Sequence, residues 1–265
     1  MSDTVPPDTI PLQQGILYGP VLSRRLGRSL GLNILPDEIK VCSLDCRYCQ
    51  YSWTGMLSVR PEAFASFLPT RVAVREALEE ELKRLRKAGT PPDTITFSGN
   101  GEATIHPDFP GIAADAAALR DALAPACRTA ILSNSTTVHR PEIRAALALL
   151  DDPILKLDTA REGTFTALNG PAKEVVFSDI VEGLRAMAGE FILQALFVSG
   201  RIDNSTDGEI ADWVRLVTDI HPRSVQVYTL DRGPADRGLA PVPAERLRAI
   251  AAALRSAGLD AYAFI

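Results

Sequence analysis

The stretch DTITFSGNGEATIHPDFPGIAADAAALRDALAPACRTAILS, residues 93–133, contains the unit from which the fold can be predicted. It starts and ends with short runs rich in β-branched and aromatic residues, 93–98 and 128–133, which are typical of strands. Between them, residues 113–123 have the composition and spacing of a helix. A strand, a helix and a second strand in this order predict two parallel strands joined by a crossover helix.

The same unit recurs along the chain. Between the first two expected strands, Val74, Leu78, Leu82 and Leu85 form one apolar stripe, which predicts an amphipathic helix. The expected strands are 29–35, 93–98, 128–133, 153–158, 191–198 and 224–230. The other expected helices are 113–123, 141–150, 178–188, 207–219 and 244–257.

Six such units predict an α/β protein with a partial (β/α)6 TIM-like barrel, an open parallel sheet with helices outside. Six are too few to close an eight-stranded barrel. A flavodoxin-like or Rossmann arrangement is the structural alternative. Residues 260–265 are expected to add an edge strand. We expect residues 1–17 to be an N-terminal extension and 18–265 to be a single domain.

Composition narrows the cellular setting. With 265 residues, 46% hydrophobic residues and a net charge of -5, the chain can bury a large core, and it has no global positive field for nucleic acid or an anionic membrane. We expect neither a secretory signal nor a membrane span, because the first residues lack a cationic segment followed by an apolar run and no apolar run approaches the length of a span. A cytoplasmic location is expected, where clustered cysteines more often bind metal or do redox chemistry than form disulfides.

Such a cluster lies in KVCSLDCRYCQY, residues 40–51, where Cys42, Cys46 and Cys49 form a C-x3-C-x2-C pattern. A zinc site would need a distant fourth ligand. A thioredoxin-like pair would leave Cys42 unexplained, and inert core cysteines would cluster this way only by chance. A cubane 4Fe-4S cluster normally takes four thiolates, so three would leave one iron open to a substrate or cofactor.

The pattern C-x3-C-x-aromatic-C after the first strand of a partial barrel resembles the radical S-adenosylmethionine (SAM) superfamily. The resemblance implies that the amino and carboxylate groups of SAM chelate the open iron. Reductive cleavage would then give methionine and a 5′-deoxyadenosyl radical that abstracts a hydrogen atom. The segments 18–33, 98–109 and 225–235 are similar to a compact subgroup related to wyosine-type tRNA-modifying synthases, and the resemblance runs from residue 18 to about 258.

The resemblance also assigns a SAM site to the ends of the next strands. SGNGE, residues 98–102, is similar to the Gly-Gly-Glu segment of the family but has Asn100 within it; an ordinary turn is the alternative. SNST, residues 133–136, could contact ribose or cap a helix, and Lys156 with Asp158 could bind SAM or form a structural ion pair. The expected cofactor-binding residues are Tyr48, Ser98, Gly99, Asn100, Gly101, Glu102, Ser133, Asn134, Ser135, Lys156 and Asp158.

The substrate is left open among a small molecule, RNA and a protein. A glycyl-radical-enzyme activase is one alternative function, and a non-catalytic metal-binding or electron-transfer module is another. The expected partner is a reductant such as a flavodoxin or ferredoxin, with no membrane partner. Candidate substrate-binding residues are Arg24, Arg25, Gln194, Gln226 and Tyr228.

Overall fold

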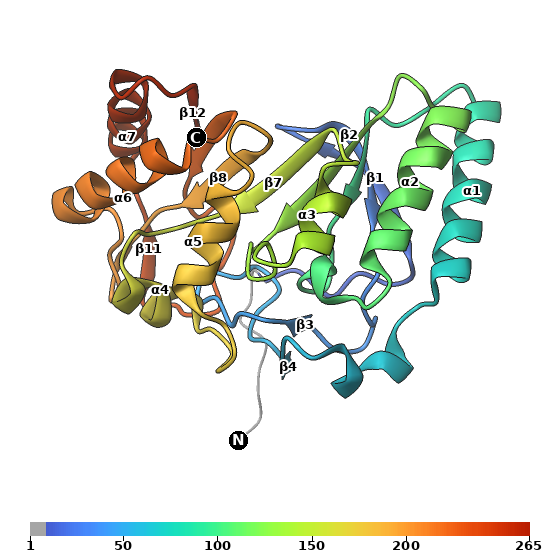
Figure 1. Ribbon diagram of the computed structural model, residues 1–265, viewed down its shortest axis with the longest axis horizontal. Coiled ribbons are helices and arrows are strands. Elements are labelled where there is room, and N and C mark those ends of the chain that lie inside the picture. Colours follow the sequence, from blue (N-terminus) through green and yellow to red (C-terminus); the bar gives the residue numbers. More distant parts are fainter. Residues whose placement is uncertain (1–8) are drawn as a thin grey trace.

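The computed structural model describes residues 9–265, and an eight-stranded sheet forms its centre (Figure 1). The strands lie side by side in chain order, and all neighbouring pairs from β2 to β12 are parallel. Only β1 is antiparallel to its neighbour. The strands of this sheet are β1 (Leu17–Ser23), β2 (Gly27–Leu32), β5 (Thr94–Phe97), β6 (Arg128–Ser133), β7 (Asp152–Lys156), β8 (Ile192–Leu196), β10 (Ser224–Tyr228) and β12 (Ala261–Phe264).

The helices follow one another along one side of the sheet, from α1 at the right of Figure 1 to α7 at the left. Parallel strands in unbroken chain order, joined by right-handed crossovers, keep all connecting helices on the same face. A Rossmann or flavodoxin-like sheet would reverse its strand order, so the partial barrel is confirmed and that alternative is wrong. The helices are α1 (Arg71–Lys87), α2 (Phe109–Leu123), α3 (Pro141–Leu147), α4 (Glu162–Asn169), α5 (Phe177–Arg185), α6 (Asp207–Ile220) and α7 (Ala244–Ser256).

Several short strands and 3-10 turns lie in the loops between the main elements. Two short pairs, β3 (Val41–Cys42) with β4 (Met56–Leu57) and β9 (Val198–Gly200) with β11 (Leu239–Pro241), lie outside the main sheet. Three 3-10 turns complete the elements of the described residues: η1 (Pro61–Ala63), η2 (Ala65–Phe67) and η3 (Ala103–Ile105).

The core lies between the sheet and its helices. The expected apolar stripe of α1 is fully inside, because Val74, Leu78, Leu82 and Leu85 are each at most 3% exposed. Burying one such side chain contributes about 1.5–3 kcal/mol. The Thr70 hydroxyl starts this helix by accepting a hydrogen bond from the backbone N–H of Ala73 at 3.2 Å.

The sequence analysis missed β1, α4 and the short strands β3, β4, β9 and β11. The strand expected at 128–133 matches β6 at both ends, and several of the other expected strands run past those of the structure. Edge strand β1 has no repeating apolar face, since Val21 and Leu22 are 47% and 89% exposed. Residues 33–35 lie beyond β2 but are still buried, so the apolar pattern continues after the strand has ended. The expected edge strand at the C-terminal end is confirmed as β12.

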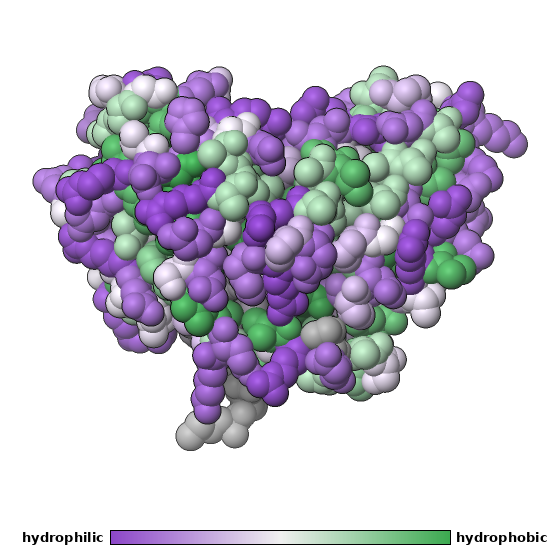
Figure 2. Space-filling model, viewed as in Figure 1, coloured by the Kyte–Doolittle hydropathy of each residue, from purple (hydrophilic) through white to green (hydrophobic). Residues whose placement is uncertain are grey.

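The outer surface of the helices is mostly hydrophilic, with small separate apolar patches (Figure 2). Among the described residues, we find no helix with the length and apolarity that crossing a membrane requires. Of the expected N-terminal extension, residues 1–8 lie outside the described part. The remainder contacts later loops: the backbone N–H of Ile10 donates to Gln50 O at 2.8 Å, and that of Gln13 donates to the side-chain oxygen of Asn100 at 2.7 Å.

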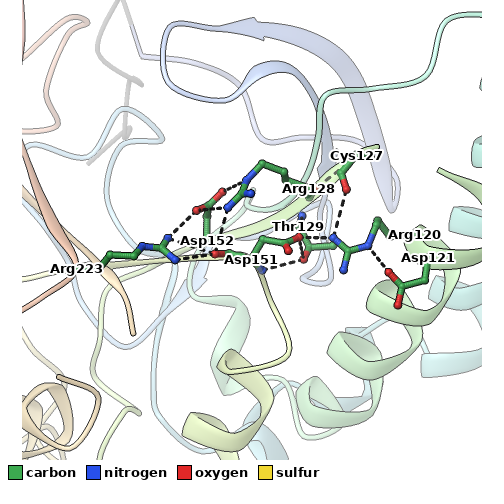
Figure 3. Close-up of polar contacts among 8 residues, drawn as sticks. All are labelled: Arg120, Asp121, Cys127, Arg128, Thr129, Asp151, Asp152 and Arg223. Carbon is green, nitrogen blue, oxygen red and sulfur yellow. Dashed lines mark hydrogen bonds and ion pairs between the residues drawn. The ribbon is translucent and has the colours of Figure 1, made fainter. Parts of the chain in front are cut away.

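An ion-pair network ties the amino-terminal ends of β6, β7 and β10 together (Figure 3). The Asp152 carboxylate accepts hydrogen bonds from both Arg128, at 2.7 and 2.8 Å, and Arg223, at 2.7 Å. The neighbouring Asp151 carboxylate accepts from Arg120 and from the backbone N–H of Thr129, the latter at 2.7 Å. Polar contacts at this end of a barrel-like sheet serve stability.

We expect Asp151→Ala to lower the free energy of unfolding by about 2 kcal/mol, because it leaves the partly buried hydrogen-bond donors of Arg120 and Thr129 without this acceptor. Asp121→Ala is the matched control, since Asp121 pairs with the same arginine but is 70% exposed, and a change below about 0.5 kcal/mol is expected. Urea denaturation measures both. Equal effects would contradict the assignment.

The Asp151 contribution should depend on pH. Burial opposes its charge, but the hydrogen bonds from Thr129 and Arg120 outweigh burial and hold the pKa of Asp151 below its usual value. A lowered pKa stabilises the folded state above the unfolded-state pKa of about 3.9. The difference between wild type and Asp151→Ala should therefore be complete at pH 7 and shrink as the pH falls below about 4.

Candidate active site

The three clustered cysteines share one cavity at the carboxyl-terminal ends of the strands. The cavity has a volume of about 430 Å³, and Cys42, Cys46 and Cys49 all line it. Ligand sites in proteins commonly measure roughly 300–1,000 Å³. Twelve other expected site residues also line this cavity: Arg24, Arg25, Tyr48, Ser98, Gly99, Gly101, Glu102, Ser133, Asn134, Lys156, Gln194 and Tyr228.

Backbone pairing fixes the cysteine loop in place. The N–H of Val41 donates to Asn100 O at 2.9 Å, and the N–H of Glu102 donates to Val41 O at 3.1 Å. Gly101 has a φ of +140°, and a Cβ there would lie 1.7 Å from the Val41 carbonyl oxygen. Only glycine fits between these two loops. The glycine segment therefore supports the cysteine loop directly.

Side-chain donors surround two of the sulfurs. The Asn134 amide donates to the Cys42 sulfur, and the Asn169 amide donates to the Cys46 sulfur, both at 3.4 Å. Lys40 is buried and donates to Ser52 O at 2.8 Å. Burial opposes its charge, but attraction to the sulfurs of Cys49, Cys42 and Cys46 in their ionised form, with a hydrogen bond to Cys49, outweighs burial and raises the pKa of Lys40.

Burial also governs the thiols. It raises the pKa of Cys42 to about 12, against an opposing effect of Lys40, and the pKa of Cys46 to about 11. Unligated, these thiols stay protonated at neutral pH, so ligation would have to displace their protons.

The donor set fits an iron-sulfur cluster. Soft thiolates with N–H donors on their sulfurs, in a mostly buried pocket, are the surroundings that such clusters use. Within residues 9–265, no three His, Cys, Asp or Glu side chains converge on a point where a single metal ion would be held. In a cubane cluster each thiolate binds its own iron, so convergence on one point is not required.

A buried charge pair stands beside the cysteines. Lys156 Nζ lies 3.2 Å from Asp158 Oδ1 and donates to the Tyr228 hydroxyl at 3.0 Å. The Asp158 carboxylate also accepts from the hydroxyl of Tyr48 and from the Asn169 amide, the latter at 2.9 Å. Asp158 does not line the main cavity and lies behind its wall.

Lys156 is the member of this pair that faces the cavity. Its ammonium lies 4.8 Å from the centre of the Tyr48 ring and 5.0 Å from that of Tyr228. Burial opposes its charge, but Asp158 and Tyr228 outweigh burial and keep the pKa of Lys156 above its usual value. Lys156 is therefore a permanent cation on the wall, held between two aromatic rings.

Glu102 links the glycine loop to the residues at the end of β6 through hydrogen bonds. Its buried carboxylate accepts from the Thr104 hydroxyl at 2.6 Å, the Ser133 hydroxyl at 2.9 Å and the backbone N–H of Asn134 at 2.6 Å. Burial raises its pKa, and these hydrogen bonds oppose the rise. Ser98, on the other side of the glycine loop, is 2.6 Å from the Tyr18 hydroxyl.

Four expected site residues do not line the main cavity: Asn100, Ser135, Asp158 and Gln226. Asn100 is fully buried and donates to Gln13 O and Pro36 O at 2.9 and 2.8 Å, so it joins loops. Gln226 accepts from Gln194 at 3.2 Å behind the wall. Ser135 is a buried residue in the left-handed region, with φ 71°.

The sequence analysis overlooked three residues that support the site: Tyr18, Lys40 and Asn169. Lys40 could have been noticed, because it is a cation only two residues before the first cysteine of the pattern. Asn169 ends the short helix α4 and carried no recognisable signal, and Tyr18 lies on the strand that was missed.

A match to the family model described as the radical SAM superfamily covers residues 39–188, which include all three cysteines, the glycine loop, Lys156 and Asp158. The chain belongs to the radical SAM superfamily. Members of this superfamily use a 4Fe-4S cluster and SAM for radical chemistry, so the expectations of an enzyme and of these two cofactors are confirmed.

Two curated relatives are similar over most of this radical SAM chain. The UPF0026 protein MJ1312 of Methanocaldococcus jannaschii is 30% identical over 89% of this chain and 70% of its own length. A protein named GTPase Obg from Brachyspira hyodysenteriae is 32% identical over 82% of this chain. The match spans only 30% of that second protein.

Solved structures share the fold at low sequence identity. A radical SAM methyltransferase from Sphaerobacter thermophilus has a TM-score of 0.63, 15% identity, and coverage of 89% of this chain and 65% of its own. Streptococcus suis SuiB bound to S-adenosylmethionine has a TM-score of 0.60, 15% identity, and coverage of 89% and 50%. TYW1 with a lysine-pyruvate adduct bound has a TM-score of 0.54, 12% identity, and coverage of 86% and 73%.

We expect Gly101→Ala to destabilise the protein by about 2 kcal/mol or more, because a Cβ would strike the Val41 carbonyl in a strained backbone conformation. Gly163→Ala is the matched control: it lies in α4, and a Cβ there would meet nothing within 4 Å. The control should be neutral or slightly stabilising. Thermal denaturation of both variants tests this, and an unaffected Gly101→Ala would contradict the close packing of the two loops.

Proposed function

We propose that Cys42, Cys46 and Cys49 hold a 4Fe-4S cluster whose fourth iron takes SAM, and that the enzyme abstracts a hydrogen atom from its substrate. The observation that carries this proposal is that the three thiols share one cavity with the glycine loop and the cationic Lys156. When bound, the cluster and SAM supply the reductive cleavage that gives methionine and the 5′-deoxyadenosyl radical.

In this proposal, the protein's own residues bind and orient. Asn134 and Asn169 hold the sulfurs of Cys42 and Cys46 in position and stabilise their negative charge through N–H donors. Lys156 binds the SAM carboxylate, and Tyr48 helps to position the adenine. Asp158 is a positioning residue, since it fixes Lys156 and Tyr48 together.

The loops around the cavity supply the remaining contacts. Gly99 and Gly101 offer their backbone to the SAM amino group, as the resemblance implies. Glu102 holds Ser133 and Asn134 toward the cavity. The buried walls shield the reacting groups from water, and the cavity opens to solvent at Arg24 and Asp231. A flavodoxin or ferredoxin serves as the electron donor in this proposal.

The proposal is tested by 5′-deoxyadenosine formation under anaerobic conditions. We expect the protein, reconstituted with iron and sulfide, to release 5′-deoxyadenosine from SAM when reduced with dithionite. Cys42→Ala, Cys46→Ala and Cys49→Ala should each abolish the product. Chromatography of the nucleoside products provides the measurement.

Cys127→Ala is the matched control, because the fourth cysteine lies in the core at the opposite end of β6. This variant should keep its iron and form 5′-deoxyadenosine at close to the wild-type rate. A wild-type protein that binds zinc in place of iron and never cleaves SAM would reject the proposed function and favour a non-catalytic metal-binding module.

A further inference from the structure

The open sheet has two edges, and the turn between β1 and β2 reaches from one to the other. Arg24, in this turn, donates to Ile265 O at 2.9 Å and pairs with Asp231 at 3.0 Å. Both side chains of the ion pair are exposed, and both residues line the cavity, so the cavity meets solvent there. The turn therefore spans the gap between the two sheet edges at the point where the cavity opens to solvent.

The next residue, Arg25, faces this cavity without a counter-ion. Its guanidinium lies over the rings of Tyr228 and Phe264, at 4.9 and 5.6 Å from their centres. Its Nη1 atom is buried and has no hydrogen-bond partner. Within residues 9–265, no carboxylate oxygen forms an ion pair with Arg25, that is, none lies within 4 Å of a guanidinium nitrogen.

Leaving Arg25 Nη1 buried without an acceptor costs free energy unless a bound group accepts a hydrogen bond from it. Arg25 as a whole is half-buried, but its buried Nη1 atom has lost its hydration without gaining an acceptor, and contacts with the rings offset only part of that loss. The ring contacts do not use the N–H donors of the guanidinium, and its planar pair of donors fits the two oxygens of a carboxylate or phosphate. Arg25 is thus built to accept an anion from the cavity.

The anion is distinct from the one that Lys156 would hold. The Tyr228 side chain separates the two cations, because it accepts from Lys156 Nζ at 3.0 Å and carries Arg25 over its ring. Lys156 contacts Tyr48 of the cysteine loop, whereas Arg25 lies in the turn that spans the two sheet edges, where the cavity opens to solvent. Two separate cations on one wall can hold two separate anionic groups.

We propose that Arg25 binds an anionic group, a carboxylate or a phosphate, of the substrate that reacts in this cavity, while Lys156 serves SAM. This inference rests on the proposed function for the identity of the second ligand. The binding of an anion at Arg25 can nevertheless be measured without any turnover.

The test uses the reconstituted full chain loaded with SAM, with inorganic phosphate and acetate as probes in NMR saturation-transfer or line-broadening titrations. We expect saturable binding of at least one probe to the wild type, and binding weakened at least about tenfold in Arg25→Gln. The probe that binds more tightly distinguishes phosphate from carboxylate. Arg28→Gln is the matched control, since it removes the same charge nearby but does not line the cavity; it should bind as the wild type does.

A parallel titration of SAM, followed by isothermal calorimetry, separates the two cations. Arg25→Gln should bind SAM as the wild type does, whereas Lys156→Met should bind it more weakly. Loss of SAM affinity in Arg25→Gln would overturn the inference, because Arg25 would then hold the SAM carboxylate. Absence of saturable binding of both probes to the wild type, or equal binding by Arg25→Gln, would also overturn it.

Arg25→Lys guards against a folding defect, because it keeps the charge and the ring contacts but loses the planar pair of donors. It should bind the favoured probe more weakly than the wild type, and unchanged affinity would count against recognition by the guanidinium. Failure of the proposed function shows itself differently: the wild type would then form no 5′-deoxyadenosine, while probe binding would still report on Arg25.

Discussion

Val41 pairs through its backbone with the glycine loop that follows β5, and the position of the cysteines depends on this contact. Its N–H and C=O groups bond to Asn100 and Glu102 on the two sides of Gly101. The contact joins the cysteine loop to the carboxyl edge of the sheet, and the absence of a side chain at Gly101 allows it. In open parallel sheets, this edge is where ligands bind.

From this contact, the site is assembled by buried polar groups that leave few donors or acceptors free. Glu102 draws the loop after β6 toward the glycine loop, and Asn134 in that loop reaches the Cys42 sulfur. Asp158 and Asn169 do the same for the loop that carries Cys46 and Tyr48. Such satisfied networks fix geometry, and an iron-sulfur site needs its ligands oriented before binding. Among the described residues, three buried side-chain atoms have no hydrogen-bond partner: Arg25 Nη1, Ser135 Oγ and Asn169 Oδ1. Of these three residues, only Arg25 lines the main cavity.

Much of this could be predicted from the sequence, for identifiable reasons. Parallel strands buried on both faces read as short apolar runs, and the residues of β5 are all buried as expected. The cysteine spacing indicated an iron-sulfur cluster of the radical SAM type. The charges of Lys156 and Asp158 stood out because they interrupt an apolar run. Edge strand β1 was missed because its exposed residues give no pattern. The contacts of Asn169 with Cys46 and of Arg25 with Tyr228 join residues far apart in the chain, so only the folded structure brings them together.

The central claim is that three thiols leave one iron open and that SAM binds it. The most direct measurement is electron–nuclear double resonance on the reduced, reconstituted protein with SAM that carries ¹⁵N in its amino group. The account predicts a hyperfine coupling between the cluster and this nitrogen, together with a change in the cluster's electron paramagnetic resonance spectrum when SAM is added. An intact cluster with no such coupling and an unchanged spectrum would contradict it.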